Sequence, residues 1–400
     1  MRKAEGWKLV CIGCGGAAET ELPDSTCRKC GNLLEIRLSR EIDGRSLFEG
    51  KGPGIWRFIE ALPFSPDVDP VSLGEGGTPL VKAGRLATKM RLRELYAKND
   101  GQNPTGSFKD RGISVAVTRA KTLGAKALVC ASTGNTAASL AAYAARAGMS
   151  AVVVVPRAGV ASGKLGQAFA YGARVFGVEG NFDQALATVF DLVRKDERFY
   201  LMNSVNPFRI EGQKITAFEI YEQLGRVPDC VVLPVGNAGN ISAIWKGFKE
   251  LQSIGVVKSQ PKMVGVQAAG AAPLAEAVSS GEPFRPLKDP HTVASAIRIG
   301  NPVSWKKALR AIGESGGKAV VVTDDEIMKA KESLAQEEGI LVEAASAAPF
   351  AALANLKLRQ DATVVCIATG NGLKDLSDHG GNRTIETAAG SEAIADKIRE

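Results

Sequence analysis

The sequence predicts an α/β protein, in which helices cover a parallel sheet, with a small cysteine-rich segment in front of it. From about Leu95 onward, short runs of β-branched residues alternate with longer alanine-rich stretches, which is typical of alternating strands and helices. Ahead of this region, four of the seven cysteines fall within the first 30 residues. We therefore expect an α/β body preceded by a metal-binding segment.

The expected strands are short, apolar and bounded by polar residues or glycine. They span residues 94–97, 127–131, 151–155, 173–178, 230–235, 263–267, 319–322 and 363–367. The expected helices are longer and rich in alanine, and they span residues 113–120, 136–147, 182–195, 241–251 and 304–312.

Composition and charge exclude several classes of protein. The longest apolar runs, such as residues 151–156, are far shorter than the roughly 20 residues that span a bilayer. No apolar stretch follows the N-terminal charges, so we expect no secretory signal and a cytoplasmic location. The net charge of +7 is dispersed, which argues against a dedicated nucleic-acid surface. The two histidines, His291 and His379, are too few for a three-histidine metal site.

The N-terminal cysteines form two C-x2-C pairs, each closely followed by glycine, which is the spacing of a zinc ribbon. Four thiolates can then converge on one Zn²⁺ ion, with Cys11, Cys14, Cys27 and Cys30 as the predicted ligands. The alternatives are two disulfides, which a reducing cytosol disfavours, or a ribbon without metal. Residues 1–40 carry seven basic against five acidic side chains, so we expect a structural role and no nucleic-acid binding.

A lysine near a predicted helix start is the first candidate for catalysis. Lys109 lies between the strand 94–97 and the helix 113–120. The partial positive charge of a helix N-terminus and desolvation both lower a lysine pKa, which favours the neutral, nucleophilic amine. A solvated surface lysine is the alternative, and it is the neighbouring motifs that argue against it.

Two turns from strand to helix offer anion sites. In Pro234-Val-Gly-Asn-Ala-Gly-Asn240, successive N–H groups at a helix start can hold a phosphate. The spacing matches neither the dinucleotide nor the Walker pattern, so we expect a phosphate without a nucleotide. The turn Ala131-Ser-Thr-Gly-Asn-Thr136 presents hydroxyl, amide and N–H groups to an anion such as a carboxylate. The alternative interpretation of this turn is an ordinary helix cap, made by the side chain of Ser132 or Thr133.

These segments together resemble the fold-type II pyridoxal-phosphate-dependent enzymes, and the threonine synthase family in particular. The similarity preserves the order of the motifs from about residue 52 to residue 375. It includes Glu75-Gly-Gly-Thr-Pro-Leu80, Asn103-Pro-Thr-Gly-Ser-Phe-Lys-Asp-Arg-Gly112, the two turns above, Asn203-Ser-Val-Asn-Pro-Phe-Arg209, Glu211-Gly-Gln-Lys214, Ala296-Ile-Arg-Ile-Gly-Asn-Pro302 and Thr369-Gly-Asn-Gly-Leu-Lys-Asp375.

The resemblance implies two doubly wound sheet domains after the zinc-ribbon-like segment 1–40. Residues 41–111 and 205–400 would form a large cofactor-binding domain, and residues 112–204 a small α/β domain. Pyridoxal 5'-phosphate would form a Schiff base with Lys109, which would also move protons. The resemblance also implies that the cofactor phosphate contacts Gly236, Asn237, Ala238, Gly239 and Asn240. The cofactor's phenolic oxygen would contact Asn135, and its pyridine nitrogen would contact Thr369. For the substrate, Ser132 and Thr133 would bind the carboxylate, and Ser204 and Arg209 would bind the phosphate.

The implied activity is the conversion of O-phospho-L-homoserine and water to L-threonine and phosphate by a homodimer. Related enzymes on the same scaffold are the alternatives, either a cysteate synthase acting on phosphoserine or a threonine or serine dehydratase. A more distant alternative is a nucleic-acid-binding ribbon protein with a vestigial enzyme body. The chain has Ala269, Ala344 and Asn371 where Glu, Pro and His are common in the family, and these departures bear on substrate identity.

Overall fold

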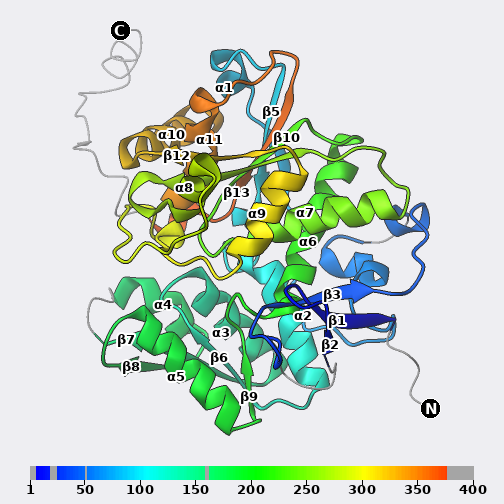
Figure 1. The fold of residues 1–400 in the computed structure, drawn as a ribbon, viewed down its shortest axis with the longest axis vertical. Coiled ribbons are helices and arrows are strands. Elements are labelled where there is room, and N and C mark those ends of the chain that lie inside the picture. The colour runs from blue at the N-terminus through cyan, green and yellow to red at the C-terminus, as the bar shows by residue number, and fades with distance from the viewer. Residues whose placement is uncertain (1–5, 19–24, 50–51, 158–161, 376–400) are drawn as a thin grey trace, which may run out of the picture.

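The computed structural model describes residues 6–18, 25–49, 52–157 and 162–375, and these residues form three sheets (Figure 1). A small antiparallel sheet has the strand order β2-β1-β3, a six-stranded sheet has the order β12-β11-β10-β13-β5-β4, and a four-stranded sheet has the order β8-β7-β6-β9. Within the two larger sheets, β4 is antiparallel to β5 and the other pairs are parallel. The α/β class is therefore confirmed.

The eight predicted strands are present in the two larger sheets, which also contain two short strands that were not predicted, β4 and β9. The small sheet consists of β1 (Trp7–Cys11), β2 (Ala17–Ala18) and β3 (Leu34–Leu38). The six-stranded sheet consists of β4 (Leu80–Lys82), β5 (Glu94–Asn99), β10 (Cys230–Pro234), β11 (Lys262–Ala268), β12 (Lys318–Val322) and β13 (Thr363–Ala368). The four-stranded sheet consists of β6 (Ala127–Ala131), β7 (Ser150–Pro156), β8 (Arg174–Val178) and β9 (Phe199–Leu201).

The helices connect and cover these strands. They are α1 (Gly84–Lys89), α2 (Lys109–Thr122), α3 (Asn135–Ala147), α4 (Ser162–Ala170), α5 (Phe182–Lys195), α6 (Pro207–Leu224), α7 (Gly239–Ser253), α8 (Pro273–Ser280), α9 (Trp305–Glu314), α10 (Asp324–Glu338) and α11 (Ala344–Ala351). The five helices expected from the sequence are all present, although the predicted helix 113–120 begins four residues earlier, at Lys109.

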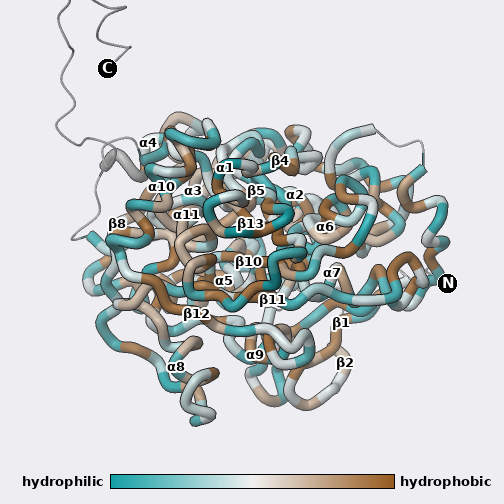
Figure 2. Tube along the Cα trace, turned by 90° about the horizontal axis from the view of Figure 1, so that it is seen from above, coloured by the Kyte–Doolittle hydropathy of each residue, from teal (hydrophilic) through white to brown (hydrophobic). Residues whose placement is uncertain are grey.

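Helices cover both faces of the six-stranded sheet. Val231 and Leu233 of β10 join one hydrophobic cluster with residues of α6, α7 and α9. Cys230 and Val232, which alternate with them, join a second cluster with residues of α1, α10 and α11. Because alternate residues of a strand point to opposite faces, β10 is buried along its whole length. It lies in the middle of the molecule in Figure 2.

Three helices approach each other closely behind the sheet through glycines. A Cβ atom on Gly212 of α6 would lie 1.9 Å from the carbonyl oxygen of Arg111 in α2, and one on Gly247 of α7 would lie 2.4 Å from that of Lys214. Only glycine permits this approach of α2, α6 and α7. The first turn of α2 is thereby held against α6, and the middle of α7 against α6. Of the helices in the described part of the chain, none is long and apolar enough to cross a membrane.

Candidate active site

The candidate residues follow the carboxyl ends of parallel strands, which is where ligands bind in open α/β sheets. The segment with Lys109 follows β5, the turn with Asn135 follows β6, the glycine-containing loop follows β10, and Thr369 follows β13. Hydrogen bonds join two of these segments directly, because Phe108 N donates to Thr369 O at 2.9 Å and Asn371 N donates to Gly106 O at 2.9 Å.

Lys109 is the first residue of α2, as its position in the sequence predicts. The neighbouring Asp110 fixes this helix start, since its carboxylate accepts hydrogen bonds from Thr105 N at 2.7 Å, Thr105 Oγ1 at 2.6 Å and Ser139 Oγ at 2.6 Å. The Lys109 side chain is partly buried, and its Nζ lies 4.0 Å from the centroid of the Phe108 ring.

Electrostatics make Lys109 an unusual lysine. Desolvation, assisted by the positive charge of Arg209, lowers the pKa of Lys109 to about 7, while the carboxylate of Glu343 acts in the opposite direction. About half of a lysine with this pKa is the neutral amine at pH 7, and the neutral amine is the form that reacts with aldehydes. The surface-lysine alternative is wrong.

The loop of residues 236–240 presents unpaired polar groups at the start of α7. Among the described residues, none accepts a hydrogen bond from the N–H groups of residues 236 to 240, and both polar atoms of the buried Asn240 side chain lack a partner. Ala238 has a left-handed backbone (φ 63°), which is strained for a residue with a Cβ atom. A cradle of free N–H groups at a helix N-terminus suits a phosphate. These residues fit the phosphate of the expected cofactor.

Asn135 begins α3 and lies against a buried carboxylate. Its Nδ2 donates to Glu343 Oε1 at 3.1 Å and to Glu343 Oε2 at 3.0 Å. Burial raises the pKa of Glu343, and the hydrogen bond from Asn135 and the charges of Lys374 and Lys109 oppose this rise. Glu343 therefore links the turn after β6 electrostatically to Lys109.

Thr369 is buried and its hydroxyl is paired with a second hydroxyl. Thr369 Oγ1 lies 2.9 Å from Ser346 Oγ, which also accepts a hydrogen bond from Gly370 N at 2.8 Å. The group near the expected position of the pyridine nitrogen is thus a neutral hydroxyl that Ser346 orients.

Arg209 is a buried guanidinium in the first turn of α6. Its Nη1 donates to Met202 O at 3.0 Å, while its Nε has no partner. Desolvation lowers the pKa of Arg209 to about 10, and no carboxylate is among the groups that act on it. Such a buried cation is costly unless an anion accompanies it. Ser204 is partly buried in the preceding turn.

The turn after β6 does not use its hydroxyls to cap α3. The N-cap residue is Gly134, without a side-chain cap, and Ser132 Oγ accepts a hydrogen bond from Gly134 N at 3.3 Å within the turn. Ser132 and Thr133 are both partly buried. The helix-cap alternative is therefore wrong, and the two side chains are available for another role.

Sequence reasoning missed three polar residues of this site. Glu343 directly precedes helix α11, and Ser346 lies within it. This alanine-rich helix carries no recognisable motif. Lys374 lies in a quoted motif, and its Nζ donates to Thr105 O at 2.6 Å and Gln167 Oε1 at 2.7 Å. The sequence signal that could have indicated Glu343 is its place as a lone acidic residue between the apolar residues 340–342 and a run of alanines.

The four N-terminal cysteines lie together, as their spacing predicts. Their Sγ atoms are all within 4.8 Å of one another, with Cys11 and Cys30 at 3.3 Å and Cys14 and Cys27 at 3.8 Å. Four thiolates around Zn²⁺ are separated by about 3.8 Å, given Zn–S bonds of about 2.3 Å. All four cysteines are free, so the two-disulfide alternative is wrong.

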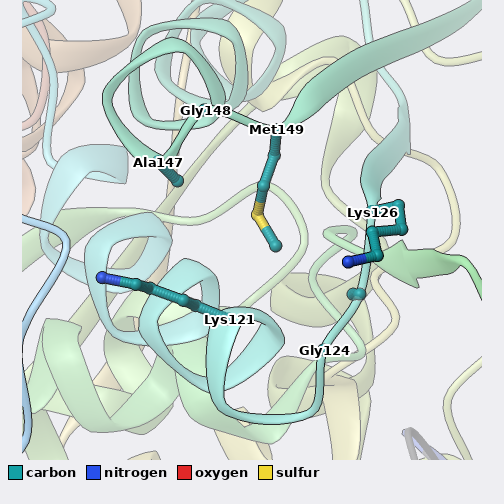
Figure 3. A pocket seen from close by; sticks show the side chains of 7 residues that line it. Lys121, Gly124, Lys126, Ala147, Gly148 and Met149 are labelled. Carbon is teal, nitrogen blue, oxygen red and sulfur yellow. The ribbon is translucent and has the colours of Figure 1, made fainter.

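A surface depression lies far from these residues. It has a volume of about 220 Å³ and is lined by residues at the C-terminal ends of α2 and α3 and in the loops that follow them, among them Lys121, Lys126 and Met149 (Figure 3). The 14 residues of α2 separate this end from Lys109 by about 20 Å. Asp69 already binds the Lys121 ammonium at 2.7 Å. This depression is therefore not part of the candidate site.

Comparison with known proteins agrees with the geometry. Residues 71–370 match the family described as "Pyridoxal-phosphate dependent enzyme". The threonine synthase of Methanocaldococcus jannaschii is 52% identical over 375 residues, which cover 91% of this chain and 92% of the relative. The threonine synthase of Methanosarcina acetivorans is 50% identical over 378 residues, covering 92% of each chain. That of Mycobacterium tuberculosis H37Rv is 49% identical over 330 residues, covering 81% of this chain and 89% of the relative.

Solved structures show the same fold at low identity. A maize serine racemase matches 76% of this chain and 92% of its own, with a TM-score of 0.65 and 21% identity. A threonine deaminase from Solanum lycopersicum matches 86% of this chain and 92% of its own, with a TM-score of 0.66 and 23% identity. The chain therefore belongs to the threonine synthase family of pyridoxal-phosphate-dependent enzymes.

Proposed function

We propose that this protein converts O-phospho-L-homoserine and water to L-threonine and phosphate. In this reaction the Cγ–O bond breaks and its electron pair leaves with the phosphate. Cβ loses one proton and gains the hydroxyl of water, and Cγ gains one proton to become the methyl group. The proton released from water balances the charge on the departing phosphate.

The residues that would hold the cofactor come from four segments. Lys109 would bind its aldehyde carbon, residues 236–240 its phosphate, Asn135 its phenolic oxygen and Thr369 its pyridine nitrogen. When bound, pyridoxal phosphate delocalises the electrons left behind when a proton is removed from the substrate carbons. The neutral Thr369 hydroxyl, paired with Ser346, does not impose a proton on the ring nitrogen as a carboxylate would.

The protein's own groups bind the substrate and move protons. Lys109 takes and returns protons as a base whose pKa of about 7 lies near neutral pH. Ser132 and Thr133 would bind the substrate carboxylate, and Ser204 and Arg209 its phosphate, because the planar guanidinium suits phosphate oxygens. Glu343 holds Asn135 in place.

The observation that carries this proposal is the buried Arg209 guanidinium without a carboxylate partner among the described residues. A dehydratase needs no group for a substrate phosphate, whereas a phosphohomoserine enzyme does. The unpaired Nε is a free donor for such an oxygen. A cysteate synthase acting on phosphoserine shares this need, so the assay must separate the two.

The test is an absorbance spectrum of purified protein, followed by phosphate release and threonine formation from O-phospho-L-homoserine. Wild type should be yellow and active, and Lys109→Ala should be colourless after dialysis and inactive. O-phospho-L-serine and unphosphorylated L-threonine, assayed in parallel, test the two sibling activities. An active Lys109→Ala, or turnover restricted to one of the sibling substrates, would overturn the proposal.

We further propose that the four cysteines bind one structural Zn²⁺, that residues 41–111 with 205–400 and residues 112–204 form two domains, and that the enzyme is a homodimer. The four converging thiolates support the zinc site, and the separate six-stranded and four-stranded sheets support the two domains. Metal analysis tests the zinc site, limited proteolysis tests the two domains, and sedimentation tests the homodimer. Salt-sensitive nucleic-acid binding that is lost on deleting the ribbon would favour a regulatory role instead.

A further inference from the structure

The cysteine-rich N-terminal sheet packs against the helix that carries Arg209. We call residues 6–18 and 25–38 the ribbon. The Trp7 ring of β1 meets the Phe208 ring edge-on, with centroids 5.4 Å apart and planes at 87°. The guanidinium of Arg119 lies 5.4 Å from each of these two ring centroids. Phe208 directly precedes Arg209, and Figure 1 shows β1 and β3 beside α2 and α6.

A second contact reaches the other side of Arg209. Lys246 of α7 donates from Nζ to Ile36 O of β3 at 2.6 Å, and the same ammonium pairs with Glu211 of α6. Glu211 is fully buried and also binds Lys214 at 2.6 Å. The Lys246 ammonium thus joins the ribbon backbone to Glu211, which lies two positions after Arg209.

The placement of α6 decides where Arg209 points. The guanidinium has one hydrogen bond within the described protein, from Nη1 to Met202 O, and its Nε is unpartnered. Its direction therefore depends on the first turn of α6, where the ribbon contacts Phe208 on one side and Glu211, through Lys246, on the other. A displaced first turn would move the guanidinium with it.

The metal site closes the ribbon at the end of the same strands. β1 ends at Cys11 and pairs with β3 from Trp7↔Leu38 to Cys11↔Leu34. Trp7, Leu9, Leu34 and Ile36 of these five-residue strands pack into the same hydrophobic cluster as Phe208 of α6. The turns that carry Cys14 and Cys30 are exposed, and a thiolate site supplies folding free energy to such segments. Closing the ribbon adds to this packing in fixing Trp7 and the Ile36 carbonyl.

We propose that the metal-bound ribbon positions Arg209 for the phosphate of the substrate, so that the cysteine cluster determines phosphate affinity from outside the active site. This rests on the proposed role of Arg209 in binding phosphate. Trp7 and Lys246 are then positioning residues, which touch neither substrate nor cofactor. Opening the ribbon weakens phosphate binding and leaves the Lys109 chemistry in place.

The test compares phosphate affinity with and without the metal in the full-length, cofactor-loaded enzyme. Cys14→Ser removes an exposed ligand and is expected to lower bound zinc below one per chain. The KM for O-phospho-L-homoserine and the Kd for inorganic phosphate, by calorimetry, should both rise about tenfold, which corresponds to losing one charge-assisted hydrogen bond. The visible cofactor spectrum should change little, because the Lys109 attachment is not disturbed.

A second pair of variants separates positioning from loss of metal. Lys246→Met breaks the link to Glu211 with the cysteines intact, and it should raise phosphate Kd by a similar factor with full zinc content. The matched control is Lys249→Met, which lies on the same helix, is 46% exposed and pairs with Glu314 at 2.8 Å. That variant should behave as wild type.

Two results would overturn the inference. The first is an unchanged phosphate Kd in zinc-depleted Cys14→Ser and in Lys246→Met. The second is a purified wild type that holds no zinc and takes up none when zinc is added. Phosphate binding is measured without turnover, so a wild type that fails to process O-phospho-L-homoserine refutes the proposed reaction, whereas the dependence of phosphate Kd on the ribbon is still decided.

Discussion

The Lys109 amine of the cofactor-free protein is expected to titrate with a pKa of about 7, against 10.5 for an ordinary lysine. At pH 7 about half of it is then neutral, compared with about 3 in 10,000 for an ordinary lysine. Only the neutral amine attacks an aldehyde. The rate of covalent capture of pyridoxal phosphate should therefore rise about tenfold per pH unit below pH 7 and level off above about pH 8.

Two substitutions should move this midpoint in opposite directions. Arg209 lowers the pKa of Lys109 and Glu343 raises it, so Arg209→Met should raise the midpoint and Glu343→Gln should lower it. An interaction of about 1.4 kcal/mol shifts a pKa by one unit, so the size of each shift gives the strength of the interaction of Lys109 with that residue. Because desolvation is the largest cause of the lowered pKa, the midpoint should stay below 10.5 in both variants.

The measurement is the change in visible absorbance after cofactor-free protein is mixed with pyridoxal phosphate across a pH series. A simple alkylamine measured in parallel corrects for the titration of the cofactor itself, and Lys109→Ala gives the non-covalent baseline. A wild-type midpoint near 10, or shifts of the same sign in the two variants, would refute the electrostatic account of the site.

Three further predictions concern the framework around Lys109. Arg111→Met leaves the buried carboxylates of Asp100 and Glu219 without their shared cation, and urea denaturation should show a loss of about 3–5 kcal/mol in the free energy of unfolding; a variant as stable as wild type would contradict this. Gly212→Ala forces a Cβ atom within 1.9 Å of a carbonyl oxygen and should cost about 1–3 kcal/mol in the same assay. Its control, Gly166→Ala in α4, meets no atom within 4 Å and should be neutral or stabilising by up to about 1 kcal/mol; equal effects would refute the packing argument. Ser346→Ala removes the partner of Thr369 and should weaken cofactor binding up to about tenfold in equilibrium dialysis, and no change would show that the hydroxyl pair is not part of the site.

Hydrophobic patterning predicted eight strands of the two larger sheets and five of the helices, but it did not predict α6. Residues 207–220 are buried on every side, so this helix has no amphipathic face that a periodic pattern could indicate. Its charged residues resemble those of a surface segment in the sequence. Glu211, Lys214 and Glu219 are instead neutralised inside the protein by partners on other elements and on α6 itself. Such pairing becomes visible only once the helices are packed.

The residues of the candidate site likewise divide into those that the sequence could predict and those that it could not. Lys109, the loop 236–240 and the turn with Asn135 could be predicted because each sits at a local junction of strand and helix, whose chemistry is readable from a few adjacent residues. Glu343 could not, because its hydrogen-bond partner Asn135 lies 208 positions away. The family departure at Asn371 also has a local explanation, since its side chain accepts from Leu373 N at 2.9 Å and donates to Gly101 O at 3.2 Å.

The charges around Lys109 bear on how the proposed reaction would be driven. Arg209 and Lys374 add two cations to this region, and the buried carboxylate of Glu343 opposes them. An excess of buried positive charge is costly in a low-dielectric interior, and an entering phosphate dianion offsets that cost. In the proposed binding mode the same guanidinium would face the oxygen that gains charge as the Cγ–O bond breaks, where a fixed cation stabilises the transition state more than the ground state. One feature would thus account for both the selection of a phosphorylated substrate and the departure of its phosphate. Arg209→Met should therefore lower kcat as well as raise KM, and opening the ribbon, which displaces the same guanidinium, should change both in the same directions by smaller factors.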